Sequence, residues 1–359
     1  MEIAKTVFEI SGYLIIVFTL IPFIRNDNWF FRVFEYPRLQ KLAAALFITG
    51  CYIVIFEVND TREYLFLGLS TLIIAYLFYQ ILPFTPFTKA QLVRGRSVLH
   101  ENRIKLFIAN VYQYNKRTEL CLKMLKKCDP DVIMLVETDA YWANKLVVLK
   151  EEYPHRVEYP LENTYGMMLY SRLKLIDSKV KFLVEDDIPS VHTQIELASG
   201  KIIRLYCVHP TPPVPQENPR STERDKELLL VAEEVKNIKE PVIVAGDLND
   251  VAWSYTTDLF SKISGLLDPR KGRGFYNTFH ARYFFLRFPL DHVFCSADFT
   301  LIRIERMPDI GSDHFPMFIE LQYEKDAKLK QEEPKADAGE KEVAEEKVHA
   351  DTGGSRHDR

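Results

Sequence analysis

The stretch that decides the fold reads PVIVAGDLN and covers residues 241–249. It begins as a run of apolar, mostly β-branched residues, which is typical of a strand buried on both faces, and it ends in the polar residues Asp247 and Asn249. A second stretch, GSDHFP at residues 311–316, places an Asp and a His directly before another apolar run. Carboxylate, amide and imidazole groups at strand ends are the groups that metal-assisted hydrolysis uses. The two stretches therefore predict a reaction centre along a sheet edge.

Strand and helix patterns alternate through the region between Lys105 and Tyr323. Strands are predicted at residues 105–111, 131–137, 166–170, 190–197, 201–208, 242–245, 292–295, 299–306 and 315–322. Helices are predicted near residues 118–127, 140–151, 221–238 and 254–263. Many strands with few helices, some of them in hairpin-like pairs, favour two packed sheets flanked by helices.

Three long apolar segments precede this region, at about residues 7–24, 42–58 and 64–84. A membrane span needs ~20 mainly apolar residues. The alternative is a soluble helical cap, but segments that are apolar all round lack the polar stripe of such a cap. The sequence therefore predicts an N-terminal membrane region, residues 1–87, with three transmembrane helices.

Basic residues are distributed unevenly around these segments. They lie between the first two segments and directly after the third, whereas the remaining loop offers only Arg62 among acidic residues; the two basic groups are Arg25, Arg32, Arg38 and Lys41, and Lys89, Arg94 and Arg96. Since positive loops stay on the cytoplasmic side, we expect a multi-pass membrane protein whose large domain is cytoplasmic.

Composition excludes several classes of function. The formal net charge of −4 does not indicate a basic nucleic-acid binder, although a local patch stays open. The five cysteines are scattered without a C-x-x-C pair, so they predict buried thiols and neither a disulfide framework nor a zinc site. Residues 324–359 are rich in Lys, Glu, Ala and Asp and are predicted to be a disordered charged tail.

Six motifs occur in an order that resembles the endonuclease/exonuclease/phosphatase superfamily, and in particular a membrane-anchored bacterial branch of it. The motifs centre on Asn110, Glu137, His209, the Asp247–Asn249 pair, Asp291 and the Asp313–His314 pair. The resemblance covers about residues 103–323 and implies a DNase I-like fold, a four-layer α/β/β/α sandwich, for a catalytic domain at residues 88–323. It also implies the bacterial inner membrane as the location.

The resemblance implies that Glu137 is the principal ligand of a divalent metal ion, with Asn110 and Asp313 as further oxygen donors. From the residues alone, Glu137 reads more simply as a solvated strand end or a neighbour of a helix N-cap, and the resemblance reverses this reading. Mg²⁺ suits oxygen ligands of this kind, and Mn²⁺ is the alternative. Some nucleases of the superfamily carry an acidic residue where this chain has Tyr112, so one tightly bound ion is expected here.

Asp247 and Asn249 lie two residues apart, so their side chains can point the same way from an extended end. One can orient or deprotonate a water molecule while the other donates to a phosphate oxygen; the alternative is an Asx-turn that caps the backbone. The resemblance implies that Asp291 holds the tautomer of His314 and that His209 approaches from the opposite sheet.

These residues define two sets of candidates. The catalytic set is His209, Asp247, Asn249, Asp291 and His314, and the substrate-binding set is His209, Asn249 and Arg172, of which Arg172 is the weaker candidate. Tyr165 and Arg224 could also touch phosphate but read more simply as packing, and His292 is expected to be structural, on the other face of its strand.

These residues predict a membrane-anchored, Mg²⁺-dependent hydrolase of phosphate esters, most simply a phosphodiesterase or nuclease. The basic and aromatic segment at residues 271–287 could bind a nucleic-acid strand or enter a lipid interface. A phospholipid head-group phosphodiesterase resembling sphingomyelinases, or a phosphatase, is therefore the alternative, and a catalytically silent scaffold is less consistent with six intact motifs. No protein partner can be inferred.

Overall fold

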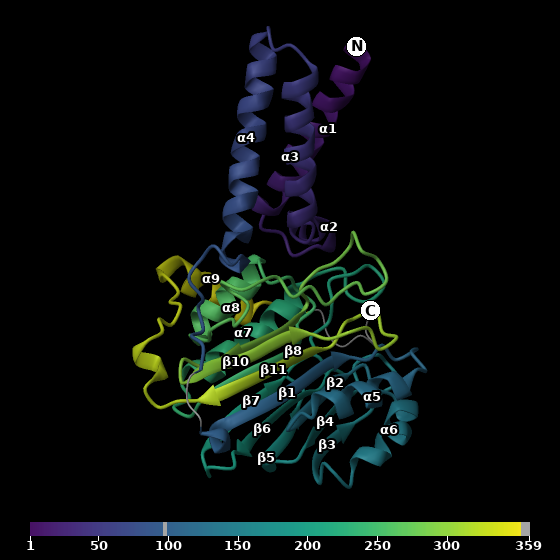
Figure 1. Ribbon diagram of the computed structural model, residues 1–359, viewed down its shortest axis with the longest axis vertical. Helices are drawn as coiled ribbons and strands as arrows, with labels where there is room; N and C mark the ends of the chain where they lie inside the picture. The colour runs from purple at the N-terminus through teal and green to yellow at the C-terminus, as the bar shows by residue number, and fades with distance from the viewer. Residues whose placement is uncertain (96–98, 353–359) are drawn as a thin grey trace.

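The computed structural model describes residues 1–95 and 99–352. Figure 1 shows a stalk of three helices standing on a layered domain. The stalk helices are α1 (Glu2–Leu20), α3 (Arg38–Ile55) and α4 (Thr61–Ile81), and a short helix α2 (Trp29–Arg32) joins the first two. All three are long and apolar enough to cross a membrane, as predicted. Helix α4 begins sharply because Asp60 and Glu63 form a reciprocal capping box.

The domain contains two mixed sheets. In the six-stranded sheet the order is β10-β11-β1-β2-β4-β3, with bounds Phe299–Arg306, Met317–Tyr323, Arg103–Asn110, Val132–Val136, Met167–Ser171 and His155–Tyr159. In the five-stranded sheet the order is β5-β6-β7-β8-β9, with bounds Lys174–Lys181, Ser190–Glu196, Ile202–Cys207, Val242–Asp247 and Asp291–Cys295. The pairs β1–β2 and β7–β8 are parallel, and the remaining pairs are antiparallel.

Helices cover the outer face of each sheet. Apolar side chains such as Ile108, Met134 and Ile243 fill the space between the sheets. The outer face of the six-stranded sheet packs on α5 (Thr118–Cys128) and α6 (Ala140–Lys145), and that of the five-stranded sheet on α7 (Thr222–Lys236) and α8 (Tyr255–Ser264). Single 3₁₀ turns lie at Ile21–Phe23, Val33–Glu35, Leu82–Phe84, His100–Asn102, Leu146–Leu149 and Ala327–Leu329. The predicted four-layer sandwich is confirmed.

One glycine fixes the approach of the two parallel strands in the five-stranded sheet. A Cβ atom on Gly246 would lie 1.9 Å from the carbonyl oxygen of Val208. Only glycine therefore lets β8 pass so close to the chain that leaves β7. This close approach brings Asp247, the next residue, beside the segment that carries His209.

The predicted disorder of residues 324–359 is wrong for part of that tail. Residues 338–349 form α9 (Ala338–His349), which begins with a capping box between Asp337 and Glu340 and packs on α7 and α8. Its small apolar residues, Val343, Ala344 and Val348, recur at helical spacing and form a narrow stripe that overall composition does not reveal. Residues 353–359 lie outside the described part of the chain.

The segment between α1 and α3 lies directly on the layered domain. The Trp29 amide donates to the Pro219 carbonyl at 2.8 Å, and the Trp253 indole donates to the Glu35 carbonyl at 3.0 Å. The Tyr36 hydroxyl donates to the backbone carbonyl of Asn249 at 2.9 Å. The base of the stalk thus holds the loop that follows β8.

Candidate active site

The candidate site forms where strand ends of the two sheets meet. Asn110 ends β1, Glu137 follows β2, and Asp247 ends β8. Asp291 opens β9 and is paired in register with Asp247, since β8 and β9 are antiparallel. The segment before β11 delivers His314, because β11 runs antiparallel to β1. Strand pairing therefore gathers side chains that are up to about two hundred residues apart.

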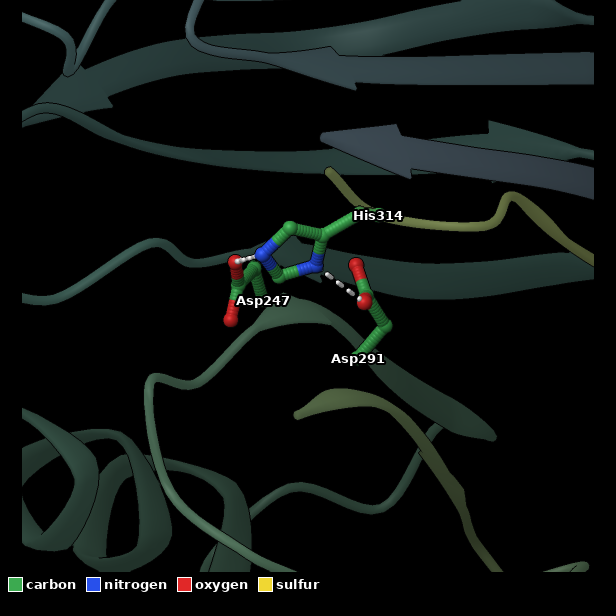
Figure 2. A group of neighbouring side chains, drawn as sticks. All are labelled: Asp247, Asp291 and His314. Atoms are coloured by element: carbon green, nitrogen blue, oxygen red, sulfur yellow. Dashed lines mark hydrogen bonds and ion pairs between the residues drawn. The ribbon is translucent and has the colours of Figure 1, made fainter. Parts of the chain in front are cut away.

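His314 lies between two carboxylates, as Figure 2 shows. Its Nδ1 is 2.8 Å from Asp291 Oδ2 and its Nε2 is 3.5 Å from Asp247 Oδ2. Burial alone would lower the pKa of His314, but Asp247 and Asp291 outweigh it and raise the pKa to about 10. We therefore treat His314 as an imidazolium ion that donates from Nδ1 to Asp291. The structure thus brings together the two residues whose pairing the sequence predicted.

Asp247 is the centre of the hydrogen-bond network. Asp247 accepts from the backbone amide of Asn249 at 3.0 Å and from the side-chain amide of Asn110 at 3.1 Å, and His209 Nε2 lies 4.0 Å from its Oδ2. Burial raises the pKa of Asp247, but the neighbouring imidazoles of His314 and His209 lower it by more, so the net shift is downward. Asp247 is thus an ionised carboxylate at neutral pH.

Glu137 is the carboxylate with the least compensation. It has a left-handed backbone, with φ 58°, and accepts from Asn110 Nδ2 at 2.7 Å and from the Gln113 amide at 3.3 Å. No Lys or Arg among the described residues forms an ion pair with Glu137 or Asp313. Burial, together with the charge of Asp313, raises the pKa of Glu137 to about 7. The charge of His314 acts in the opposite direction but does not outweigh burial, so a buried carboxylate without a Lys or Arg partner, with Asp313 near it, fits a hard divalent ion that would add positive charge.

Asn110 is placed differently from the sequence prediction of an oxygen ligand. Its amide nitrogen bridges Glu137 and Asp247, whereas its Oδ1 accepts from the Tyr112 backbone amide at 2.9 Å. In this arrangement Asn110 holds the two carboxylates together. It would offer oxygen to a cation only after rotation of the amide group.

A second cluster of possible metal ligands is Asp247, Asp291 and His314, whose ligand atoms lie within 4.8 Å of one another. Both nitrogens of the imidazole already face a carboxylate in this cluster. A protonated ring repels a cation, so Glu137 and Asp313 fit the metal better.

Asn249 and His209 are the two remaining candidates and lie on the segments that follow β8 and β7. Asn249 has φ 51° and donates from Nδ2 to the Pro210 carbonyl at 2.9 Å, which leaves one N–H of its amide for another acceptor. The His209 ring lies 5.3 Å from the ring of Tyr165, whose hydroxyl donates to Glu217. Tyr165 is therefore a packing partner of His209.

Arg172 does not belong to the site, which corrects the sequence prediction. It follows β4, and because β4 is antiparallel to β2, it lies beside the start of β2 and its backbone amide donates to the Asp131 carbonyl. Its guanidinium pairs with Asp129 at 2.7 Å and with Glu152. The site lies beyond the other end of β2, at Glu137.

Arg224 and His292 are structural. Arg224 is fully buried, pairs with Asp225 at 2.8 Å and donates to the Asn249 carbonyl at 2.9 Å, so it supports the site from behind. His292 lies 2.6 Å from Arg270 and 2.8 Å from the Asp250 carbonyl oxygen. Burial, with the charge of Arg270, lowers the pKa of His292 to about 3, so it stays neutral.

Two supporting residues were missed by the sequence reasoning. The backbone amide of Gln113 donates to Glu137. The side chain of Gln113 accepts from the Thr164 backbone amide and donates to the Glu162 carbonyl. The Ser312 hydroxyl donates to the Asn110 carbonyl at 2.8 Å and accepts from the His314 amide at 3.0 Å. The only sequence signal was their position, three residues after Asn110 and two before His314.

Comparisons with known proteins agree with this geometry. A sequence profile of the Endonuclease/Exonuclease/phosphatase family matches residues 108–314. A curated-sequence search found no match. D. rerio TDP2 complexed with a single-strand DNA product is 18% identical with a TM-score of 0.52, covering 61% of this chain and 99% of that one. The human Nocturnin catalytic domain is 17% identical with a TM-score of 0.51, covering 67% of this chain and 99% of that one.

Proposed function

Because this chain belongs to the endonuclease/exonuclease/phosphatase family, we propose that it is a membrane-anchored, Mg²⁺-dependent phosphodiesterase. The observation that carries the proposal is a buried carboxylate without a Lys or Arg partner, Glu137, close to an ionised carboxylate, Asp247, that contacts the imidazolium of His314. This arrangement provides a site for a cation, a base and a proton-bearing group within one cluster.

Each residue has a defined task in this proposal. Glu137 and Asp313 would hold the metal ion, which would supply Lewis-acid neutralisation of phosphate charge. Ionised Asp247 orients the attacking water and accepts its proton. His314, fixed by Asp291, stabilises the negative charge that develops on the phosphate oxygens, and Asn249 and His209 donate to the same oxygens. Mn²⁺ could replace Mg²⁺, because both prefer carboxylate oxygens and water.

The surface beside the site favours a phosphodiester within a larger molecule. Arg282 lies 5.8 Å from the ring of Tyr112, and Arg287 and Arg306 lie 5.0 and 4.3 Å from the ring of Phe315. Cations combined with aromatic faces suit nucleotides, and the DNA product bound to the related TDP2 supports this substrate class.

A lipid head group is the second candidate because of one loop. Tyr283, Phe284, Phe285 and Leu286 are all more than half exposed, and the Phe285 carbonyl accepts from Gln40 near the start of α3 at 2.8 Å. Exposed aromatic residues at the foot of a membrane helix suit an interface with lipid.

Membrane anchoring and orientation are also part of the proposal. The segment between α1 and α3, which carries Arg25 and Arg32, lies at the end of the stalk that joins the domain, which supports a cytoplasmic domain in an inner membrane; Arg96 lies outside the described residues. Reporters fused after Tyr323 distinguish the two orientations. We expect activity only from a reporter that works in the cytoplasm; activity of an export-dependent reporter would reverse the orientation.

The substrate test uses the full chain in lipid nanodiscs, assayed against single-stranded DNA, RNA, phospholipids and a small chromogenic phosphodiester. We expect hydrolysis of at least one phosphodiester that requires Mg²⁺ and is lost in His314→Ala. Hydrolysis that survives chelation of divalent ions would contradict the metal assignment, and cleavage of monoesters alone would make the chain a phosphatase.

A further inference from the structure

A large cavity lies between the foot of the stalk and the domain, beside the contacts that join them. Its volume is about 1160 Å³, and its walls come from the ends of α1 and α4, from the α1–α3 segment, from residues 252–255 and from α9. None of the proposed catalytic or metal-binding residues lines it. It is therefore a site separate from the reaction centre.

The cavity has more positive charge than its own acidic residues neutralise. Six basic and four acidic residues line it; Asp27 and Glu35 form ion pairs with Arg32, Asp258 forms ion pairs with Lys262 and Lys271, and Glu346 is the fourth acidic residue. Three lining arginines, Arg25, Arg38 and Arg220, form no ion pair with any carboxylate of the described residues. An anion entering the cavity would therefore find cations that are not already engaged with carboxylates.

Two of the lining arginines are buried and have unused donors. Arg38 is 7% exposed and makes its side-chain hydrogen bonds, to Gln80 and to the Trp253 carbonyl, through Nη1 alone. Arg32 is also 7% exposed, and its Nε has no partner among the described residues. A buried donor without an acceptor is costly, so these groups suit an acceptor that the chain itself does not supply.

The remaining wall is apolar and aromatic and lies at the ends of the helices that are long enough to span a membrane. Phe23 is 60% exposed and lies beside Tyr76, while Tyr79 is 71% exposed. Arg25 stacks on Tyr255 at 5.2 Å, and Lys271 lies 6.0 Å from the ring of Phe84. Aromatic residues beside basic residues at this level match the boundary between acyl chains and head groups.

We propose that this cavity binds the phosphate head group of an anionic phospholipid, with Arg25 and Arg38 beside the phosphate and the acyl chains along α1 and α4. The proposal rests on the membrane anchoring proposed above. It does not depend on the substrate of the reaction centre.

Native mass spectrometry of the full chain in detergent tests the proposal, with phosphatidylglycerol and phosphatidylcholine of identical acyl chains as probes. The background is His314→Ala, so that turnover cannot consume either lipid. We expect phosphatidylglycerol to bind at least about tenfold more tightly, and Arg25→Gln and Arg38→Gln each to reduce that preference several-fold. The matched control is Arg62→Gln, in the first turn of α4 at the far end of the stalk, which should keep the preference.

Equal binding of the two lipids, or an unchanged preference in both cavity variants, would overturn the proposal. Should Arg38→Gln fail to fold, Arg25→Gln decides the result, because Arg25 is exposed and, among the described residues, its side chain stacks on Tyr255 without a hydrogen bond or ion pair. Glycerol 3-phosphate is the soluble probe. Displacement of phosphatidylglycerol by equimolar glycerol 3-phosphate would show a site for a soluble anion and overturn the lipid assignment.

Discussion

Two buried acidic clusters lie on opposite sides of the loop that follows β8, and they differ in how their charge is balanced. At the junction with the stalk, Asp225 contacts Arg224 at 2.8 Å, Lys347 at 2.8 Å and Arg32 at 3.3 Å. Burial acts against ionisation, but these three cations lower the pKa of Asp225 far below its usual range. In the reaction centre, burial and Asp313 raise the pKa of Glu137 to about 7.

The difference separates structure from chemistry. A carboxylate that holds three cations is satisfied by the fold and holds the stalk, α7 and α9 together. A carboxylate that only an amide side chain and a backbone amide contact is held in place but keeps an unmet demand for positive charge. We therefore expect substitutions in the first cluster to reduce stability and substitutions in the second to reduce activity.

The largest expected effect comes from Glu137→Ala. If Glu137 is the principal metal ligand, as proposed, its removal should reduce turnover by roughly 10³-fold or more while leaving the fold intact, because the Lewis acid is lost and the core is unchanged. Steady-state turnover at saturating substrate and modest Mg²⁺, with circular dichroism, measures both. Glu152→Ala at the far end of the sheet is the control, and turnover near the original level in Glu137→Ala would remove Glu137 from the metal site.

The pair Asp291 and His314 should give the next largest effect. His314→Ala and Asp291→Asn should each lower turnover by ~10²–10⁴-fold, as expected for a positioned proton-bearing group. The double variant should be little worse than His314→Ala, because Asp291 acts through His314 at 2.8 Å. If the two losses multiply instead, Asp291 has a separate role, for example as a metal ligand.

Asp225→Asn should affect stability and not the chemistry. Removing one partner of a buried ion-pair network leaves Arg32, Arg224 and Lys347 under-compensated, at a cost of ~3–5 kcal/mol in the free energy of unfolding. Thermal unfolding of the full chain measures it. Glu233→Gln, in the exposed pair with Lys236 on the same helix, should change little; equal shifts for both variants would mean that the junction network does not stabilise the protein.

The smallest effect is a pH dependence of metal binding. The pKa of Glu137 is raised from 4.5 to about 7, so the folded chain holds this proton to a higher pH than the unfolded chain does. Without a divalent ion, this group lowers stability progressively as pH rises from about 4.5 to about 7. Mg²⁺ must compete with the proton, so its affinity should fall about tenfold for each pH unit below 7. Thermal unfolding with and without Mg²⁺ from pH 5.5 to 8 measures this; a stabilisation by Mg²⁺ that is independent of pH would contradict it.

Local pattern determined much of this protein. The apolar runs at residues 105–111, 131–137 and 242–245 became β1, β2 and β8, because buried strands need only a short run of suitable residues. The three apolar segments became the stalk helices. Asn110, Glu137 and Asp247, which end or directly follow β1, β2 and β8, lie in the site. The order of six motifs was sufficient for the family and hence for the layered fold.

Tertiary structure alone decided the rest, because it depends on which distant groups meet. Arg172 and Glu137 both border strands of one sheet, but the antiparallel pairing of β4 with β2 puts them at opposite ends. The orientation of the Asn110 amide follows from Glu137 and Asp247, which lie 27 and 137 residues away. Composition predicts disorder where helix α9 forms. The helix is held by the ion pair of Lys347 with Asp225 and by the packing of Ala344 on the apolar face of α7, and a sequence pattern cannot specify these contacts.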